Sequence, residues 1–214
     1  MTEKDLIIIG AGYIAGFLVN NQELFNEKYN IIGFLDDDPK KTGKKYWDIP
    51  VLGSIDDLAN YNGVSVVIGI AAPKIKVQIL KRINVADYHF PNFVSRNVWI
   101  SNDVQIGKGN IIYPGVSINH GSRIADFCVI NMNCALGHDA KLGDYCALSP
   151  GVNLGGVTVM GKGVFMGIGA TTNHFLTIGD FAIIGGQAMI IENIPEGVTV
   201  VGVPGKIVLS KKSS

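Results

Sequence analysis

A histidine and an aspartate stand next to each other, as His138 and Asp139, in the stretch LGHDAKLGD. The pKa of histidine lies near neutrality, so its side chain can take a proton from an attacking amine or hydroxyl. A neighbouring carboxylate can orient the imidazole ring and stabilise the imidazolium that forms. The pair therefore indicates a general base with its supporting acid.

This pair interrupts a strict repeat of six residues. Reading from Val94 to Ile190 in steps of six gives seventeen positions, of which sixteen are aliphatic or methionine. Helices and strands have periods of 3.6 and 2 residues, so neither explains a period of six. The residue after each aliphatic one is often Gly, Asn or Ser, types that tolerate tight-turn backbone angles, and we expect the turns there.

The repeat predicts a triangular parallel coil in which three hexads complete one lap of 18 residues. Each lap stacks on the previous one, so a continuous core forms that no single repeat could bury alone. The side chain four residues after the aliphatic one is usually small, and we expect it to point inward as well. Cys128, Cys134 and Cys146 occupy that slot, so we interpret them as buried hydrophobic residues rather than a metal or redox cluster.

Three histidines fall on one edge of this coil. His120, His138 and His174 each follow the repeat aliphatic by two residues, with Gly156 in the lap between the last two. Zinc binding is one possible function of such a column of histidines, because neutral imidazoles are common zinc ligands. Laps lie about 4.8 Å apart, which separates His138 and His174 by about 10 Å, too far to share an ion. General-base catalysis by His138 is favoured, since only this histidine has a carboxylate beside it.

One column of outward-pointing strand positions is wholly apolar. It consists of Ile111, Val129, Ala147, Phe165 and Ile183. An apolar column on the outside of a coil is expected to be covered by other protein. We predict a subunit interface there, and packing of the N-terminal residues against the column is the alternative.

The first ninety residues follow the order strand, glycine-rich turn, helix, strand, acid. The expected strands span residues 6–9, 31–35 and 64–70. The glycine-rich turn and the helix after it extend over residues 10–20, and a second helix spans residues 73–84. Gly10, Gly12 and Ala15 match the GxGxxG/A fingerprint of Rossmann-like domains, in which a helix N-terminus holds a phosphate group. Asp36 stands where a ribose-binding acid would stand. The domain has half the size of a dinucleotide fold, which is enough for one nucleotide.

Composition excludes several classes of function. The chain has 18 Lys and Arg against 18 Asp and Glu, and a net charge of zero lacks the electrostatic footprint of nucleic-acid or anionic-membrane binding. Its apolar runs are too short to span a bilayer, and its first residues do not resemble a secretory signal. We therefore expect a cytoplasmic protein.

The stretch INMNCALGHDAKLGDYCALSPGVNLGG, the tail GVPGK and the N-terminal domain together resemble bacterial sugar acetyltransferases of the bacillosamine and sialic-acid type. These belong to the hexapeptide-repeat acyltransferases, and the resemblance covers essentially the whole chain. It implies a small Rossmann-like domain over residues 1–90 that binds a nucleotide-activated sugar. It also implies a left-handed parallel β-helix over residues 91–214 that binds acetyl-CoA and forms homotrimers.

The resemblance further implies roles for individual residues. His138 is the base, Asp139 its partner, and Asn131 lies close to the acceptor. Expected near acetyl-CoA are the backbone around Gly156, Ile168 and Gly186 and, at the nucleotide end of the cofactor, Lys206. Expected near the nucleotide sugar are Gly10, Gly12 and Tyr13 in the glycine-rich turn, Asp36 and Asp37 beside the uracil, and Lys76, where relatives use Arg. Some members carry a second histidine nine residues after the base, where this chain has Ala147; a backbone N–H such as that of Gly156 is the expected substitute.

We therefore expect an N-acetyltransferase that moves acetyl from acetyl-CoA to the amino group of a nucleotide-linked amino sugar, most simply a UDP-linked 4-amino-4,6-dideoxy sugar. The amine would attack the thioester directly, without a metal or an acyl-enzyme, because no cysteine stands beside the dyad. One alternative is an O-acetyltransferase acting on sialic acid or another free sugar. Another is a non-catalytic protein of this fold that senses a nucleotide sugar.

Overall fold

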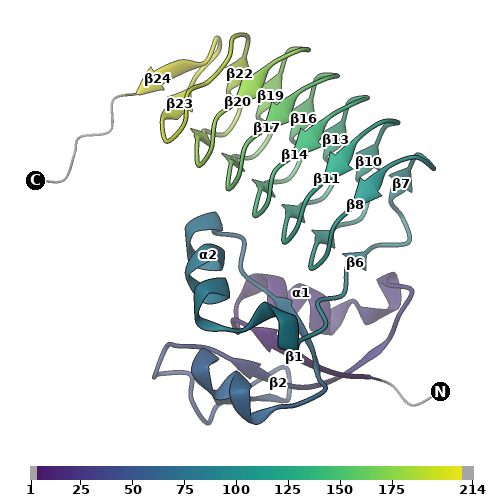
Figure 1. Ribbon diagram of the computed structural model, residues 1–214, viewed down its shortest axis with the longest axis vertical. Helices are drawn as coiled ribbons and strands as arrows, with labels where there is room; N and C mark the ends of the chain where they lie inside the picture. The colour runs from purple at the N-terminus through teal and green to yellow at the C-terminus, as the bar shows by residue number, and fades with distance from the viewer. Residues whose placement is uncertain (1–3, 209–214) are drawn as a thin grey trace, which may run out of the picture. The chain divides into compact units, whose positions relative to one another are not determined.

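A computed structural model describes residues 4–208. The chain forms two compact units, and the boundary between them in the sequence falls after Phe93. The N-terminal unit is an α/β domain, and the C-terminal unit is a long coil of short strands (Figure 1).

The N-terminal unit contains a five-stranded sheet with the order β3-β4-β2-β1-β5. Its strands are β1 (Lys4–Ile9), β2 (Tyr29–Leu35), β3 (Lys45–Tyr46), β4 (Ile49–Gly53) and β5 (Ser65–Ile68). β1 pairs in parallel with β2 and β5, β2 pairs in parallel with β4, and β3 pairs antiparallel with β4. The four parallel strands have the order of one half of a Rossmann fold, as expected. The short β3–β4 hairpin was not foreseen.

Helices connect these strands. They are α1 (Tyr13–Asn20) and α2 (Pro73–Arg82), with the short 3₁₀ helices η1 (Gln22–Leu24), η2 (Ile55–Asn60) and η3 (Val85–Asp87). α1 begins directly after the glycine-rich turn, with Gly12 at its N-cap. α2 begins with a proline, whose missing N–H costs nothing in the first turn of a helix. Both helices therefore start where the sequence signals place them.

The coil has three faces, whose strands are parallel except at the C-terminal end of one of them. The six-stranded face holds β7 (Trp99–Ile100), β10 (Ser117–Ile118), β13 (Ala135–Leu136), β16 (Asn153–Leu154), β19 (Thr171–Thr172) and β22 (Met189–Ile190). The five-stranded face holds β8 (Gln105–Ile106), β11 (Arg123–Ile124), β14 (Lys141–Leu142), β17 (Val159–Met160) and β20 (Thr177–Ile178). The eight-stranded face holds β6 (Phe93–Val94), β9 (Ile111–Ile112), β12 (Val129–Ile130), β15 (Ala147–Leu148), β18 (Phe165–Met166), β21 (Ile183–Ile184), β23 (Thr199–Val201) and β24 (Lys206–Val208).

From β6 to β22, neighbouring strands of each face are 18 residues apart in the chain. On the six-stranded face, for example, Ser117 pairs in parallel with Ala135. Arg123 pairs with Lys141 on the five-stranded face in the same way. The predicted lap of three hexads is confirmed.

The turns differ from the expectation. The left-handed φ falls three residues after the repeat aliphatic and not one residue after it, as at Asp139 (57°) and Val157 (59°). The glycine directly after the aliphatic is required for another reason. A Cβ on Gly137 would lie 2.6 Å from the backbone nitrogen of Gly156 in the next lap. Glycine is needed there because the laps approach closely.

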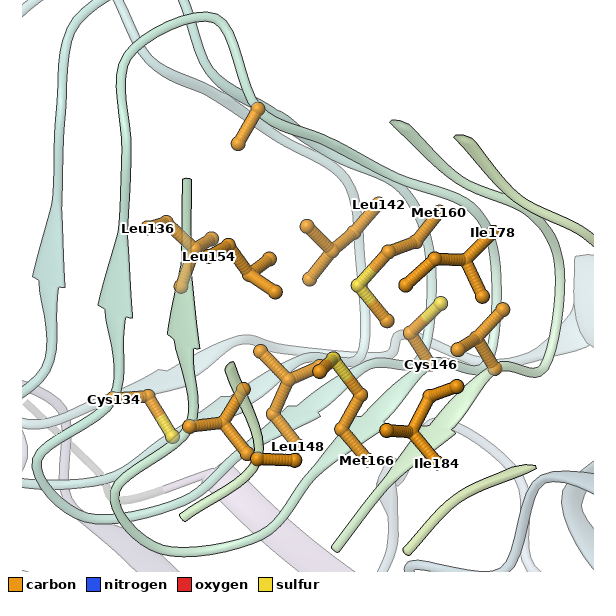
Figure 2. Packing of buried hydrophobic residues seen from close by; sticks show 14 of the residues in the cluster. Cys134, Leu136, Leu142, Cys146, Leu148, Leu154, Met160, Met166, Ile178 and Ile184 are labelled. Atoms are coloured by element: carbon orange, nitrogen blue, oxygen red, sulfur yellow. The ribbon is translucent and has the colours of Figure 1, made fainter. Parts of the chain in front are cut away.

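The interior of the coil is filled by ladders of equivalent side chains (Figure 2). One ladder contains Leu142, Met160 and Ile178, and all three side chains are buried. The three cysteines are buried and unpaired with one another, as interpreted from the repeat. Burial raises the pKa of the Cys134 thiol to about 11.

The outward apolar column is only partly covered within the chain. Ile111, Val129 and Ala147 are buried, Phe165 is half-buried, and Ile183 is 41% exposed. A subunit interface along this column stays a prediction, and in the single chain its exposed end lies at Ile183.

Candidate active site

His138 and Asp139 lie at the corner between β13 and β14. The backbone N–H of Asp139 donates to the carbonyl oxygen of His120 in the preceding lap, at 2.8 Å. His138 Nδ1 lies 2.8 Å from Asp139 Oδ2. An ionised carboxylate only accepts hydrogen bonds, so Nδ1 carries the ring proton and Nε2 presents its lone pair. This is the tautomer that a general base requires.

The electrostatics of the pair favour an ionised aspartate. The hydrogen bond from His138 lowers the pKa of Asp139, and the nearby His138, His120 and Lys141 charges act in the same direction. The side chains of His138 and Asp139 are 43% and 48% exposed, so a ligand can reach both. The carboxylate is thus available to stabilise an imidazolium formed during proton transfer.

Two adjacent laps define the surroundings of the imidazole. The ring of His120 stacks on that of His138, with centroids 5.5 Å apart and an interplanar angle of 15°. In the following lap, a Cβ on Gly156 would lie 2.5 Å from His138 Nε2. The base therefore occupies the space that a side chain at position 156 would need.

His174, one lap further on, makes a contact that the sequence did not reveal. Its Nδ1 accepts a hydrogen bond from the backbone N–H of Gly156 at 3.0 Å. This corrects the expectation that the Gly156 N–H is free to polarise an acyl carbonyl. His174 itself is exposed at the surface of the coil.

The remaining residues expected in the coil site lie away from this corner. Asn131, Ile168 and Gly186 follow strands β12, β18 and β21, so they lie on the edge between the eight-stranded and six-stranded faces. His138 lies on the edge between the six-stranded and five-stranded faces. Ile168 is 62% exposed, and Lys206 is exposed on β24. A single chain therefore does not bring Asn131 and His138 to one edge.

The N-terminal unit contains a cavity of about 210 Å³ at the carboxyl end of its parallel strands. Its lining residues are Gly10, Asp36, Asp37, Ile55, Ile70, Ile75, Gln78, Ile79 and Arg82. In α/β sheets this end of the strands is where ligands bind. Small-molecule pockets are lined mostly by apolar side chains with a few polar groups, and this lining combines four isoleucines with Asp36, Asp37, Gln78 and Arg82.

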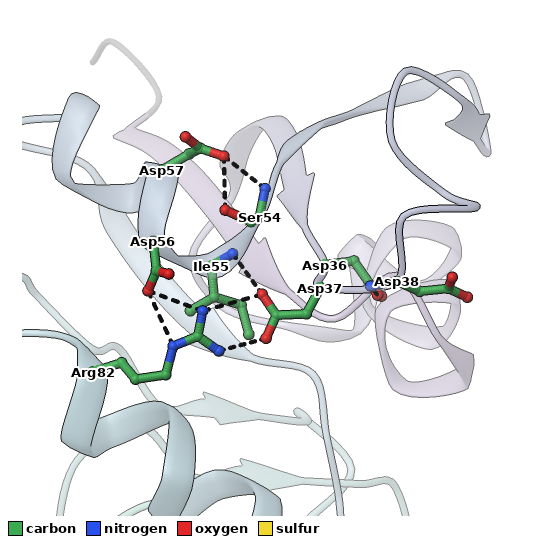
Figure 3. A network of polar contacts seen from close by, with 8 residues as sticks. All are labelled: Asp36, Asp37, Asp38, Ser54, Ile55, Asp56, Asp57 and Arg82. Atoms are coloured by element: carbon green, nitrogen blue, oxygen red, sulfur yellow. Dashed lines mark hydrogen bonds and ion pairs between the residues drawn. The ribbon is translucent and has the colours of Figure 1, made fainter.

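Asp37 faces this cavity as part of an ion-pair network (Figure 3). Both carboxylate oxygens of Asp37 accept hydrogen bonds from the guanidinium of Arg82, which also lies 2.9 Å from an Asp56 oxygen. The backbone N–H of Ile55 donates to Asp37 as well, at 3.1 Å. The hydrogen bonds from Arg82 hold the pKa of Asp37 below its usual value. Sequence reasoning missed Arg82, because its partner lies 45 residues away in the chain.

Asp36 lines the cavity and is also tied to the rest of the domain. Its Oδ2 accepts the backbone N–H of Ala11 at 2.8 Å and the Lys41 ammonium at 2.7 Å, and its Oδ1 accepts the N–H of Asp38. Burial alone would raise its pKa, but these hydrogen bonds outweigh burial and lower it. The carboxylate, whose side chain is 12% exposed, therefore ties the glycine-rich turn to the end of β2.

Among the other residues predicted for the nucleotide site, some are open to solvent and one is buried. A Cβ on Gly12 would meet open space, and Tyr13 is 100% exposed at the start of α1. Gly10 has a φ of 91°, which favours glycine, and it lines the cavity. Lys76 is only 1% exposed, so its ammonium is not on the surface as a diphosphate-binding group would be.

Within residues 4–208, no three His, Cys, Asp or Glu side chains gather closely enough to hold a metal ion. No helix in the same range has the length and apolarity needed to cross a membrane.

Comparisons with known sequences match part of the chain. Residues 5–83 match the PglD N-terminal domain. A redox-sensing transcriptional repressor, Rex from Thermosipho africanus, is 35% identical over 78 residues, which are 36% of this chain and 37% of the repressor. The chain thus spans little more than a third of that relative.

Comparisons with solved structures extend over nearly the whole chain. Perosamine N-acetyltransferase (PerB) from Caulobacter crescentus, solved with CoA and GDP-perosamine, is 26% identical with a TM-score of 0.86, and 97% of this chain and 98% of that chain are covered. The acetyltransferase domain of PglB from Neisseria gonorrhoeae, solved with acetyl-CoA, is 26% identical with a TM-score of 0.87, over 97% and 100% of the two chains. WeeI from Acinetobacter baumannii is 26% identical with a TM-score of 0.83, over the same shares.

The expected fold is therefore confirmed: a small Rossmann-like domain is followed by a left-handed parallel β-helix. The resemblance is confirmed as well: the chain carries a PglD N-terminal domain and has the fold of the hexapeptide-repeat sugar N-acetyltransferases of the bacillosamine and perosamine type.

Proposed function

We propose that this chain transfers acetyl from acetyl-CoA to the amino group of a nucleotide-linked amino-dideoxy sugar. The observation that carries the proposal is the His138–Asp139 pair, whose 2.8 Å hydrogen bond leaves Nε2 as a free proton acceptor. The coil in which it lies has the fold of proteins solved with CoA or acetyl-CoA.

In this reaction His138 would remove the proton from the sugar amine as the nitrogen attacks the thioester carbonyl. The amine is protonated in solution, so the base acts on the ammonium before or during attack. Asp139 would stabilise the resulting imidazolium. Direct attack is favoured over a cysteine acyl-enzyme, because Cys134 and Cys146 are buried and their thiols donate to backbone carbonyls at 3.2 Å and 3.1 Å.

The nucleotide would bind in the N-terminal unit, with its base in the cavity that Asp37 and Arg82 line. A carboxylate beside a guanidinium offers an acceptor and a donor to the edge of a base. The diphosphate would approach the open N-terminus of α1 at Gly12 and Tyr13. We propose UDP as the nucleotide, and GDP, which the Caulobacter enzyme binds as GDP-perosamine, is its competitor.

A homotrimer is part of the proposal. Asn131, Ile168 and Gly186 lie on one edge of the coil and His138 on another, so a neighbouring chain is needed to bring the two sets together. The acetyl-CoA groove would then run between subunits. We also propose that residues 1–90 form a nucleotide-sugar-binding domain and residues 91–214 a catalytic domain. A cytoplasmic location is part of the same proposal.

The test is thiol release from acetyl-CoA with a panel of acceptors. The panel contains UDP-, GDP- and dTDP-linked 4-amino-4,6-dideoxy sugars, their 3-amino counterparts, and free sialic acid. Turnover with one nucleotide amino sugar supports the proposal and identifies the nucleotide. Turnover with sialic acid alone would make the chain an O-acetyltransferase, and no turnover with any acceptor would contradict the proposal.

A further inference from the structure

The backbone N–H of Gly156 is already engaged in this structure. It donates to His174 Nδ1 at 3.0 Å, so it is a weak donor for any additional acceptor. The same hydrogen bond sets the protonation of the imidazole. A neutral histidine that accepts at Nδ1 carries its proton on Nε2, and His174 is therefore held as an Nε2–H donor.

We propose that His174 polarises the acetyl carbonyl through this Nε2–H group. The inference rests on the proposed acetyl transfer and adds a residue to its mechanism. His174 occupies the same corner position as His138, two laps along the coil, and is exposed to ligand. Position 156, between them, carries no side chain, and the His138 ring itself takes the space that one would need, so the two imidazoles flank the Gly156 backbone.

The spacing of the two histidines suits such a step. Two laps of about 4.8 Å place equivalent positions about 10 Å apart. A base lies about 3 Å from the amine nitrogen that it deprotonates, and a donor lies about 3 Å from its acceptor oxygen. The forming N–C bond and the C–O bond add about 1.5 Å and 1.2 Å. Base, amine, carbonyl and donor in sequence therefore span at most about 9 Å along the bonds, which two imidazole side chains that leave the coil two laps apart can bracket.

Each atom and proton in the step has a destination. The sugar ammonium first gives one proton through His138 to solvent. The neutral amine nitrogen then forms a bond to the carbonyl carbon and gives a second proton to His138 Nε2. The carbonyl π electrons move to the oxygen, where the His174 N–H stabilises the negative charge. The C–S bond then breaks, and the CoA thiolate takes the proton from the His138 imidazolium. Acetamide and free CoA are formed, and His174 keeps its proton throughout.

Three substitutions separate this role from a merely structural one. In His174→Asn, the amide oxygen stands near the position of Nδ1 and still accepts the Gly156 N–H, but the Nε2 donor is lost. His174→Ala loses both groups. His174→Gln places an amide N–H near the position of Nε2. We expect kcat to fall by about 10²- to 10³-fold in both the Asn and Ala variants, with a partial recovery in Gln and little change in the KM for acetyl-CoA.

A matched control is Asn102→Ala. Asn102 is exposed and occupies the same corner position two laps on the other side of His138. We expect its kcat to remain within about threefold of the wild type, since substitutions of exposed residues away from the site have small effects on the protein. A His174→Asn variant as active as the wild type would overturn the inference, because His174 would then serve only to accept the Gly156 N–H. A His174→Ala variant faster than the wild type would overturn it too.

A second readout needs no sugar acceptor. Infrared difference spectra of bound [1-¹³C]acetyl-CoA report the thioester C=O stretch directly. We expect a lower frequency in the wild type than in free acetyl-CoA, and a return toward the free value in His174→Asn and His174→Ala. That result would support His174 even if every sugar in the panel were refused, in which case only the proposed acceptor would fail. Equal frequencies in wild type and variants would contradict the role of His174.

Discussion

Alanine substitution of two neighbouring glycines in the coil is expected to have different consequences. Gly156→Ala should lower kcat, and Gly155→Ala should lower the thermal stability. In Gly156→Ala the new Cβ would lie 2.5 Å from His138 Nε2, while ordinary contact begins near 3.4 Å. The imidazole must therefore retreat by about 1 Å, which breaks its 2.8 Å hydrogen bond to Asp139 Oδ2. Displacing a catalytic group by about 1 Å costs about 10²-fold in rate, so we expect kcat to fall by about that factor.

Gly155→Ala is the matched comparison. Its Cβ would lie 2.5 Å from the backbone carbon of Asn173, and backbone cannot turn aside as an exposed imidazole can. Overpacking of this kind costs about 1–3 kcal/mol, which corresponds to a fall of several degrees in the thermal midpoint. Gly156→Ala should instead keep its thermal midpoint within about 2 °C of the wild type. The assay is thiol release with the best acceptor, together with thermal unfolding by circular dichroism. Wild-type kcat in Gly156→Ala would refute the placement of the base against Gly156.

Three further predictions concern side chains whose surroundings are described above. Asp139→Asn should lower kcat/KM by about 10²-fold or more, because the amide no longer holds the His138 tautomer as an anion does; equal pH–rate profiles for variant and wild type would count against this. The lowered pKa of Asp36 means that its stabilising contribution is present above about pH 4 and is lost as the pH falls further, so thermal midpoints measured from pH 7 to pH 3 should decline less in Asp36→Asn. The three buried cysteines should not react with a thiol reagent until the protein is unfolded, when all three should react; fast labelling of the native protein would show that the core is misplaced.

The coil was predictable because its signal is redundant. Sixteen aliphatic or methionine residues at steps of six are a pattern that no helix or sheet produces, and each additional lap confirms the register of the last. The dyad was predictable for the same reason. Once His138 was assigned to a corner, its neighbour Asp139 had to lie at that corner too, and local geometry brought the two side chains together.

The features that sequence reasoning missed are contacts between residues that are distant in the chain. Arg82 pairs with Asp37 across 45 residues, and Gly156 donates to His174 across 18. Neither pairing leaves a local pattern in the residues concerned. The position of the left-handed φ was wrong because the glycines were assigned to the turn, whereas stacking of the laps requires them. A glycine in the sequence indicates that there is little space at its position. It does not indicate which neighbouring atoms occupy that space.

The N-terminal site was predictable in outline but not in its details. The glycine-rich turn and the acid after β2 are where the fingerprint places them. The Asp36 carboxylate, however, already accepts hydrogen bonds from the Ala11 N–H and the Lys41 ammonium. The adjacent Asp37 lines the cavity as well, held by Arg82. How each of two neighbouring carboxylates is engaged depends on side-chain packing that a motif does not contain.

The measurement that tests the central claim most directly is the turnover of His138→Ala beside the wild type, with acetyl-CoA binding measured on both. His138 is partly exposed and lies outside the core of the coil, so its removal should leave the fold and cofactor binding intact. General-base catalysis contributes about 10²- to 10⁴-fold, and we expect kcat to fall by that factor while the Kd for acetyl-CoA stays within about threefold. A variant that acetylates the nucleotide amino sugar at the wild-type rate would contradict the account.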